Sequence, residues 1–158
     1  MARRKEGTLR RQIKQIRPFR SRREEGALVI LRTAGELRRR LARTLKASGL
    51  SLEQYNALRI LRGAGPNGLP TLEVAARMIE HSPAITRLLD KLEAKGLAQR
   101  LRCEKDRRRV YCVVTPAGLR LLEALDEPTA ACTERFMNVL PPGDLDRLIA
   151  ALDRIRGS

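Results

Sequence analysis

Hydroxyl, methyl and guanidinium groups gather at the start of one predicted helix, on Ser82, Ala84, Thr86 and Arg87. An arginine there can donate two hydrogen bonds to a guanine, and a threonine can contact a base, a phosphate or a thymine methyl. A serine beside a helix N-terminus suits a phosphate group. The alternative is an ordinary amphipathic helix whose Arg87 is only solvated.

A cluster of cations follows this helix at the tip of a predicted β-hairpin. Six basic residues fall within ten positions, and they are Arg100, Arg102, Lys105, Arg107, Arg108 and Arg109. Narrow minor grooves of DNA attract arginine, and Asp106 could orient a neighbouring arginine by a charge-assisted hydrogen bond. Alone, such a turn is commonly a solvated loop. Directly after a recognition-type helix, it favours DNA binding over enzymatic activity.

The residues offer little for catalysis or for a metal centre. His81 is the single histidine, and no Ser-His-Asp, Cys-His or paired-carboxylate arrangement is visible. Cys103, Cys112 and Cys132 lack paired metal-ligand or disulfide spacing. We therefore predict no enzymatic activity, no catalytic residue, no cofactor and no metal. Cys103 and Cys112 lie on opposite strands of the hairpin, so a redox-responsive regulator stays an alternative, which a reducing cytosol disfavours.

The charge balance indicates a polyanionic partner. The 158 residues include 33 basic and 18 acidic side chains, a net charge of +15. Such a surplus favours DNA, RNA or an acidic membrane face, and a GC-rich genome would explain arginine over lysine but not basic over acidic. No apolar run approaches the ~20 residues that span a bilayer, and no secretory signal is visible. We predict a cytoplasmic protein with no membrane partner.

Hydrophobic periodicity predicts a mostly α-helical chain with one small β-hairpin. Residues 1–23 form a basic arm, interpreted either as a disordered tail or as a source of phosphate or partner-subunit contacts. A helix from Glu24 to about Ala47 ends at Ser48-Gly49 and carries one long apolar stripe, suited to packing in a dimer or within the chain. Ser51 caps the next helix with Gln54 as a capping box, and residues 63–70 form a loop.

The second half of the chain continues with strong start and stop signals. Thr71 is predicted to cap a short helix, and Ser82 to cap the next, with Pro83 in its first turn and Gly96 as its stop. Strands follow at residues 97–103 and 110–115. Thr115-Pro116 opens a long helix that continues to Leu140, which Pro128 should kink or interrupt, and Asp144 is predicted to cap the last helix.

Four sequence runs resemble the MarR family of bacterial transcriptional regulators. They are LSLEQY at 50–55, SPAITRLLDKLEAKGL at 82–97, DRRRV at 106–110 and TPAG at 115–118. The resemblance covers about Glu24 to Ile155. It implies a homodimer in which 24–49 and 116–158 form the dimerisation region, and 50–115 forms a winged helix-turn-helix lobe (the winged lobe below).

The same resemblance implies specific roles. Positions matching the family's DNA contacts are Ser82, Ala84, Thr86 and Arg87 on the helix, with Asp106, Arg107 and Arg108 on the wing. Many members release DNA when a small, often aromatic and anionic, effector binds. The expected function is thus a dimeric, sequence-specific repressor on a pseudo-palindromic operator in double-stranded DNA. The main alternative is a protein that coats any duplex without sequence preference.

Overall fold

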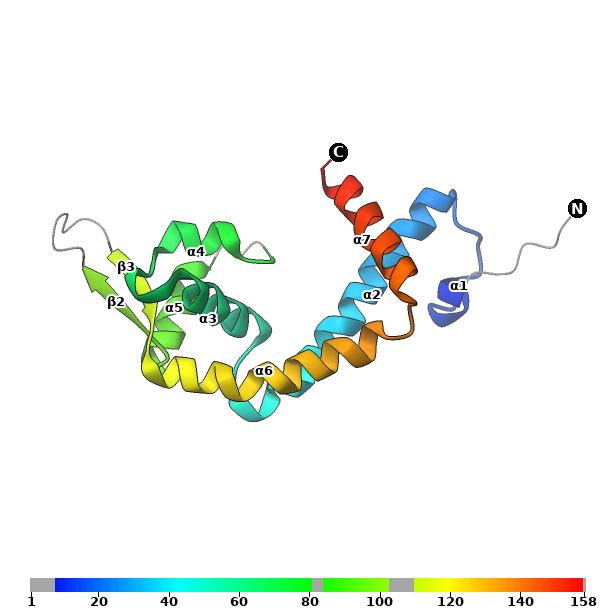
Figure 1. The fold of residues 1–158 in the computed structure, drawn as a ribbon. Helices are drawn as coiled ribbons and strands as arrows, with labels where there is room; N and C mark the ends of the chain where they lie inside the picture. Colours follow the sequence, from blue (N-terminus) through cyan, green and yellow to red (C-terminus); the bar gives the residue numbers. More distant parts are fainter. Residues whose placement is uncertain (1–7, 81–83, 103–109, 158) are drawn as a thin grey trace, which may run out of the picture. The chain divides into compact units, whose positions relative to one another are not determined.

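The computed structural model describes residues 8–80, 84–102 and 110–157 (Figure 1). The chain divides into two compact units, Met1–Arg39 and Arg40–Ser158, and each is described by itself. The described residues are mainly helical, with a three-stranded antiparallel sheet. The predicted fold class, mostly α with a small β wing, is therefore confirmed.

The first unit contains a helix that the sequence did not predict. Helix α1 (Thr8–Gln12) lies inside the basic arm and is followed by α2 (Arg22–Leu45), which crosses into the second unit. The side chain of Leu9 is buried. Lys14 adopts a left-handed backbone, with φ of 52°. Its amide donates to the carbonyl of Arg11 at 3.2 Å, and that of Gln15 donates to the carbonyl of Arg10 at 3.0 Å, which closes the helix end.

Local capping signals set the entry into the winged lobe. Helix α2 passes into a 3-10 turn, η1 (Lys46–Ser48), and Gly49 stops it with a φ of 67°. The hydroxyl of Ser51 accepts from the amide of Gln54 at 3.2 Å, and the amide of Ser51 donates to the Gln54 side chain at 3.1 Å. This reciprocal pair is the predicted capping box, and it starts α3 (Leu52–Ala64).

Aliphatic side chains fill the core of the winged lobe because the chain has few aromatic residues, 3% of the total. Helix α3 contacts α4 (Thr71–Arg77), α5 (Ile85–Ala94), α6 (Pro116–Met137) and the sheet, so it lies at the centre of this core. Fully buried positions come from each of these elements: Leu58, Leu61, Val74, Leu89, Leu92, Cys112 and Leu122. Packing around α3 therefore holds the helices of the lobe in place.

The sheet has one strand more than the predicted hairpin. After the short turn η2 (Gly65–Asn67), β1 (Leu69–Pro70) pairs with β3 (Val110–Val114), and β3 pairs with β2 (Ala98–Arg102), in the order β1-β3-β2. Leu69 lies opposite Cys112, and Ala98 opposite Val114. Gly68 permits this pairing because a Cβ there would lie 2.3 Å from the carbonyl oxygen of Cys112. The interpretation of 63–70 as loop alone was wrong.

The start of α4 differs from the prediction. Pro70 occupies its N-cap position, so Thr71 is the first helical residue and not the cap. The hydroxyl of Thr71 instead lies 3.8 Å from the sulfur of Cys112. Proline at the cap fixes φ near −59° without supplying a side-chain acceptor.

Helix α5 starts later than predicted and ends where predicted. Ala84 occupies its N-cap position, whereas the predicted cap Ser82, with His81 and Pro83, lies outside the described residues. At the other end Gly96 has a φ of 68°. The amide of Leu97 donates to the carbonyl of Leu92 at 2.9 Å. This left-handed stop is the one that Gly96 predicted.

The last two helices show one confirmed start and two corrected boundaries. Thr115 caps α6, its hydroxyl accepting from the amide of Gly118 at 3.1 Å. Helix α6 ends at Met137, not Leu140. Pro128 does not interrupt it, since one missing hydrogen bond is outweighed by long helical segments on both sides, and the predicted kink stays a prediction. Pro141, not Asp144, caps α7 (Pro142–Arg156). Asp144 lies in its first turn and pairs with Arg147 at 3.0 Å.

Candidate nucleic-acid interface

Helix α5 has one buried face and one exposed face. Ile85, Leu89 and Leu92 point into the core of the lobe. The three described candidates for base contact, Ala84, Thr86 and Arg87, are exposed at its first turn. Among the described residues Arg87 forms no ion pair, so its guanidinium can meet an external acceptor. A helix that offers its first turn to solvent has the form needed to enter a major groove.

A network of ion pairs joins strand β2 of the hairpin to helix α5. The guanidinium of Arg100 on β2 lies 2.6 Å from Asp90 and 2.6 Å from Glu93, both on α5. The backbone amide of Arg100 also donates to Glu93 at 3.0 Å. Burial disfavours the charged form of Arg100, but hydrogen bonds to Asp90 and Glu93 outweigh it and raise the pKa of the guanidinium. Helix α5 and the hairpin are thus linked at a fixed point.

This network changes the interpretation of one wing cation. The sequence placed Arg100 among six cations of the hairpin, whereas the structure uses it within the lobe. The predicted wing residues Asp106, Arg107, Arg108 and Arg109 lie outside the described residues. In the sequence, residues 103–109 connect Arg102 and Val110, which are paired positions of the sheet.

The two described cysteines are buried, as expected for residues that pack within the fold. Cys112 is 1% exposed on β3, which confirms its place in the packing of the wing. Cys132 is also buried, on α6. Cys103 lies outside the described residues, so the disfavoured alternative of an oxidative link to Cys112 is not tested.

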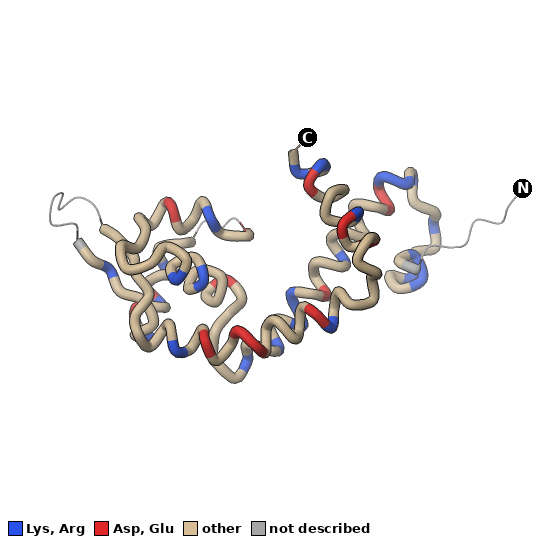
Figure 2. Tube along the Cα trace, viewed as in Figure 1, with Lys and Arg blue, Asp and Glu red and all other residues tan. Residues whose placement is uncertain are grey.

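Charge is distributed unevenly along the chain (Figure 2). The winged lobe, residues 50–115, carries 12 basic and seven acidic residues, and residues 116–158 carry five basic and seven acidic ones. The first 39 residues carry 13 basic and four acidic residues, a net +9. The strongest positive charge therefore lies in the first unit.

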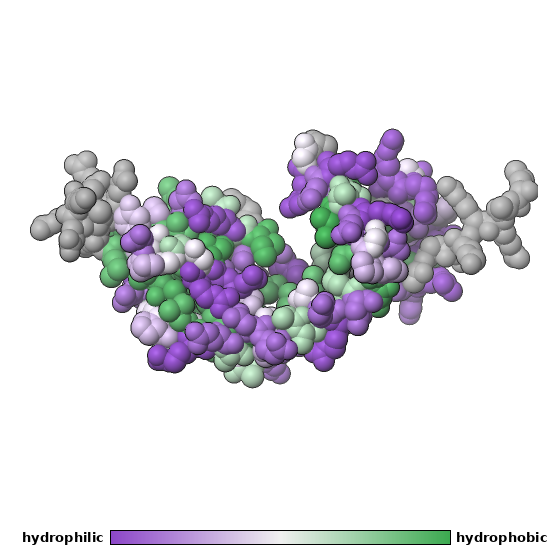
Figure 3. Space-filling view, in the orientation of Figure 1, coloured by the Kyte–Doolittle hydropathy of each residue, from purple (hydrophilic) through white to green (hydrophobic). Residues whose placement is uncertain are grey.

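Large apolar side chains also reach the surface (Figure 3). On α2, Val29, Ile30 and Leu31 are exposed, and on α7 so are Leu148, Ile149 and Ile155. Runs of exposed aliphatic residues on a helix are a common mark of protein–protein contact. Within the described part of the chain, no helix has the length and apolarity to cross a bilayer, and no group of acidic, cysteine or histidine side chains could hold a metal.

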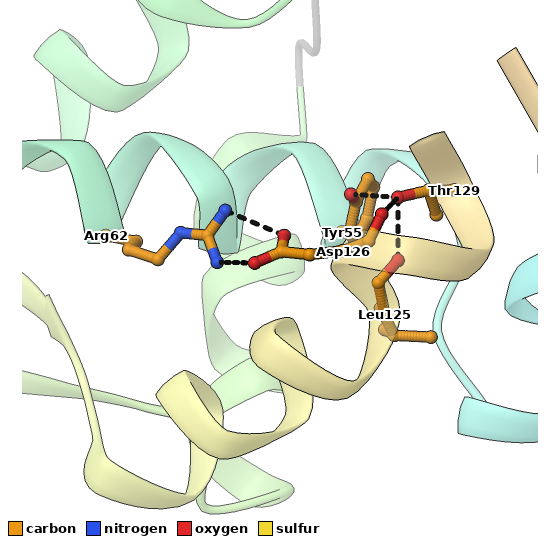
Figure 4. A network of polar contacts seen from close by, with 5 residues as sticks. All are labelled: Tyr55, Arg62, Leu125, Asp126 and Thr129. Carbon is orange, nitrogen blue, oxygen red and sulfur yellow. Dashed lines mark hydrogen bonds and ion pairs between the residues drawn. The ribbon is translucent and has the colours of Figure 1, made fainter. Parts of the chain in front are cut away.

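A polar network joins α3 to α6 (Figure 4). Arg62 donates two hydrogen bonds to Asp126, at 2.8 and 2.9 Å, and this bond lowers the pKa of that carboxyl. The hydroxyl of Tyr55 lies 2.9 Å from that of Thr129, which donates to the carbonyl of Leu125 at 2.7 Å. Arg62 and Asp126 are 64 residues apart in the sequence, and Tyr55 and Thr129 are 74 apart, so no local pattern could have revealed these two contacts.

Comparisons with known proteins agree with this architecture. Residues 50–110 match the sequence profile of the MarR family. The chain is 30% identical over 112 residues to YkoM, an HTH-type transcriptional regulator of Bacillus subtilis, covering 71% of each protein. The chain belongs to the MarR family. It is a winged-helix transcriptional regulator, a class of proteins that are not enzymes.

Two solved structures show how far the fold is shared. A MarR transcription factor of Planctomyces limnophilus is 38% identical, with a TM-score of 0.66, and the match covers 86% of this chain and 98% of that one. BpsR of Bordetella bronchiseptica, whose DNA binding is regulated by 6-hydroxynicotinic acid, is 20% identical with a TM-score of 0.78. That match covers 90% of this chain and 99% of BpsR. The MarR fold therefore extends over most of the chain.

Proposed function

We propose that this MarR-family protein is a dimeric, sequence-specific DNA-binding repressor of the cytoplasm that a small effector releases from its operator. One observation carries the proposal: the first turn of α5 presents Thr86 and Arg87 to solvent while its opposite face is locked into the core. Such a helix can enter a major groove without refolding. Repression follows by steric occlusion of the promoter.

Base contacts and phosphate contacts have separate roles in this proposal. Arg87 reads guanine, Thr86 contacts a base or a thymine methyl, and Ser82 and Ala84 lie against the backbone and groove wall. On the wing, Arg107, Arg108 and Arg109 enter the adjacent minor groove, oriented by Asp106. The contact of Arg100 with α5 supports both parts, because it fixes where the hairpin leaves the recognition helix.

Dimerisation is proposed for residues 24–49 and 116–158. The exposed aliphatic residues of α2 and α7 support it, since each set would be covered by a second copy of the chain. A two-fold dimer places two recognition helices about 34 Å apart, which requires a pseudo-palindromic operator. The effector is proposed to be a small aromatic acid, by analogy with BpsR and its ligand 6-hydroxynicotinic acid.

The experiment measures binding of the full chain to the intergenic DNA upstream of its own gene and to a random duplex of equal length. Arg87→Ala should weaken operator binding by about 1–3 kcal/mol and blunt discrimination at one base position, with a much smaller effect on random DNA. Arg120→Ala, which removes another exposed arginine, on α6, is the control, provided that its dimer mass equals that of the wild type. Equal losses on both duplexes for Arg87→Ala would contradict the base-reading role and favour a DNA-coating protein.

A further inference from the structure

The N-terminal segment 8–23 (the basic arm segment) contains cations without counter-ions of its own. It holds seven basic residues and no acidic one: Arg10, Arg11, Lys14, Arg17, Arg20, Arg22 and Arg23. In Figure 2 part of the helix α1 within it is blue. The segment holds no acidic residue to balance this charge, so each cation must be solvated, bond to other groups of the chain or meet an external anion.

Two of these cations already have structural uses. The guanidinium of Arg10 donates to the carbonyl of Gln15 at 3.1 Å and to that of Ile16, which closes the turn after α1. Arg22 forms an ion pair with Glu25. The remaining five side chains are exposed, and none has an ion pair among the described residues: Arg11, Lys14, Arg17, Arg20 and Arg23.

The backbone at Lys14 gives a second, independent observation. Its φ of 52° lies in the left-handed region, where a helix stop normally uses glycine. A side chain with a Cβ costs about 1 kcal/mol there. The chain nevertheless has a lysine at this stop, although it uses glycine at the equivalent stops Gly49 and Gly96. The stop therefore keeps an exposed cation in the basic arm segment where glycine would fit the backbone better.

We propose that the basic arm segment is a second, sequence-independent DNA-binding site that contacts backbone phosphates. The choice of duplex DNA among polyanions rests on the proposed function. An anionic membrane fits less well, because α1 has only five residues and buries its one apolar side chain, Leu9. The exposed Ile13 and Ile16 follow the helix, so they form no amphipathic helical face with it. The segment adds affinity, and the base contacts of α5 retain the choice of sequence.

Counterion release gives the proposal a quantitative signature. Each phosphate contact contributes about 0.9 to the slope of log affinity against log salt. The variant Arg11→Gln/Lys14→Gln/Arg17→Gln removes three cations per chain, or six per dimer, so the slope should fall by about 2 to 5. The loss of affinity should be the same on operator and random duplex, leaving their ratio unchanged.

The matched control removes three exposed arginines from α7, as Arg147→Gln/Arg154→Gln/Arg156→Gln. Because α7 lies in the proposed dimerisation region, the dimer mass of this variant is first required to equal that of the wild type. It changes the net charge equally but lies in a region with more acidic than basic residues, so the slope should stay at the wild-type value. Lys14→Gly is the sharpest single change. It should relieve the left-handed backbone and raise the thermal midpoint, yet lower the salt slope by about 1 to 2 across the two chains.

Several outcomes would overturn the proposal. An unchanged salt slope in the triple variant would do so, as would a fall in dimer mass by analytical ultracentrifugation that accounts for the lost affinity. So would lost binding to phosphatidylserine vesicles with DNA binding intact. Failure of the proposed function looks different: the wild-type protein would bind operator and random duplex equally, while the triple variant would still show the reduced slope.

Discussion

Tyr55 on α3 and Thr129 on α6 form a buried hydrogen bond between their hydroxyl groups. Which hydroxyl donates determines which of the two substitutions should cost more stability. Thr129 has a single hydroxyl proton and gives it to the carbonyl of Leu125 at 2.7 Å, so Tyr55 must donate to Thr129 across their 2.9 Å contact. Both residues are buried, at 6% and 7% exposure, and water cannot replace a lost partner at either one.

The two single substitutions should therefore have unequal costs. Tyr55→Phe removes the donor and leaves Thr129 bonded to Leu125, so it should cost about 0.5–1.5 kcal/mol, the net worth of one hydrogen bond. Thr129→Val leaves the Tyr55 hydroxyl buried without an acceptor and should cost about 1–3 kcal/mol. The double variant should be no less stable than Thr129→Val alone, because it removes both polar groups.

Urea unfolding of the four proteins at one fixed protomer concentration gives the required free energies, since dimer stability depends on concentration. The cycle should show a coupling energy of about 0.5–3 kcal/mol between the two residues. If Tyr55→Phe proves more costly than Thr129→Val, or if the costs simply add, the assigned donor and the buried contact are both wrong.

Further predictions concern the helix starts, the wing root and pH. Gly118→Ala should destabilise the protein by more than about 2 kcal/mol, because its Cβ would lie 2.2 Å from the carbonyl oxygen of Leu97. Gly143 lies in open space, so Gly143→Ala should leave the protein as stable or make it more stable. Thermal unfolding measures both effects. Arg100→Gln removes the ion pairs between the wing and α5, so it should reduce operator affinity about 3- to 10-fold in fluorescence anisotropy. It should lower the free energy of unfolding by under about 1 kcal/mol. Arg147→Gln should change neither the affinity nor the stability. The depressed pKa of Asp126 means that its stabilisation is fully present above its ordinary value of 3.8 and is lost as pH falls through the lower folded value. Below about pH 4, Asp126→Asn should therefore lose slightly less stability than the wild type in acid unfolding. The difference should be under about 1 kcal/mol because the ion pair is half exposed. The same pH dependence of stability in both proteins would contradict the contact.

The sequence predicted features that depend on near neighbours. The capping box of Ser51 and Gln54 and the Thr115 cap arise from residues three apart, and the glycine stops at Gly49 and Gly96 arise from single positions. Backbone preference and local hydrogen bonds decide such features before tertiary packing acts. The buried face of α5 followed for the same reason, from apolar spacing along one helix.

The errors occur where proline or distant contacts decide the outcome. Thr71 and Asp144 look like caps, but Pro70 and Pro141 occupy the cap positions with φ of −59° and −58°. Strand β1 has two residues, one of them proline, and forms only because β3 lies beside it. Arg100 resembled a wing cation because its partners, seven and ten positions earlier, lie on a helix that only the folded sheet brings near.

The specificity ratio of the wild-type protein tests the central claim most directly. Its affinity for the upstream intergenic duplex should be measured against a random duplex of equal length and composition, both at physiological salt. A groove-reading helix in a two-fold dimer predicts a ratio above about 10³. A ratio near one would show that the chain binds DNA through charge alone. The assignment of Thr86 and Arg87 to base recognition would then be wrong.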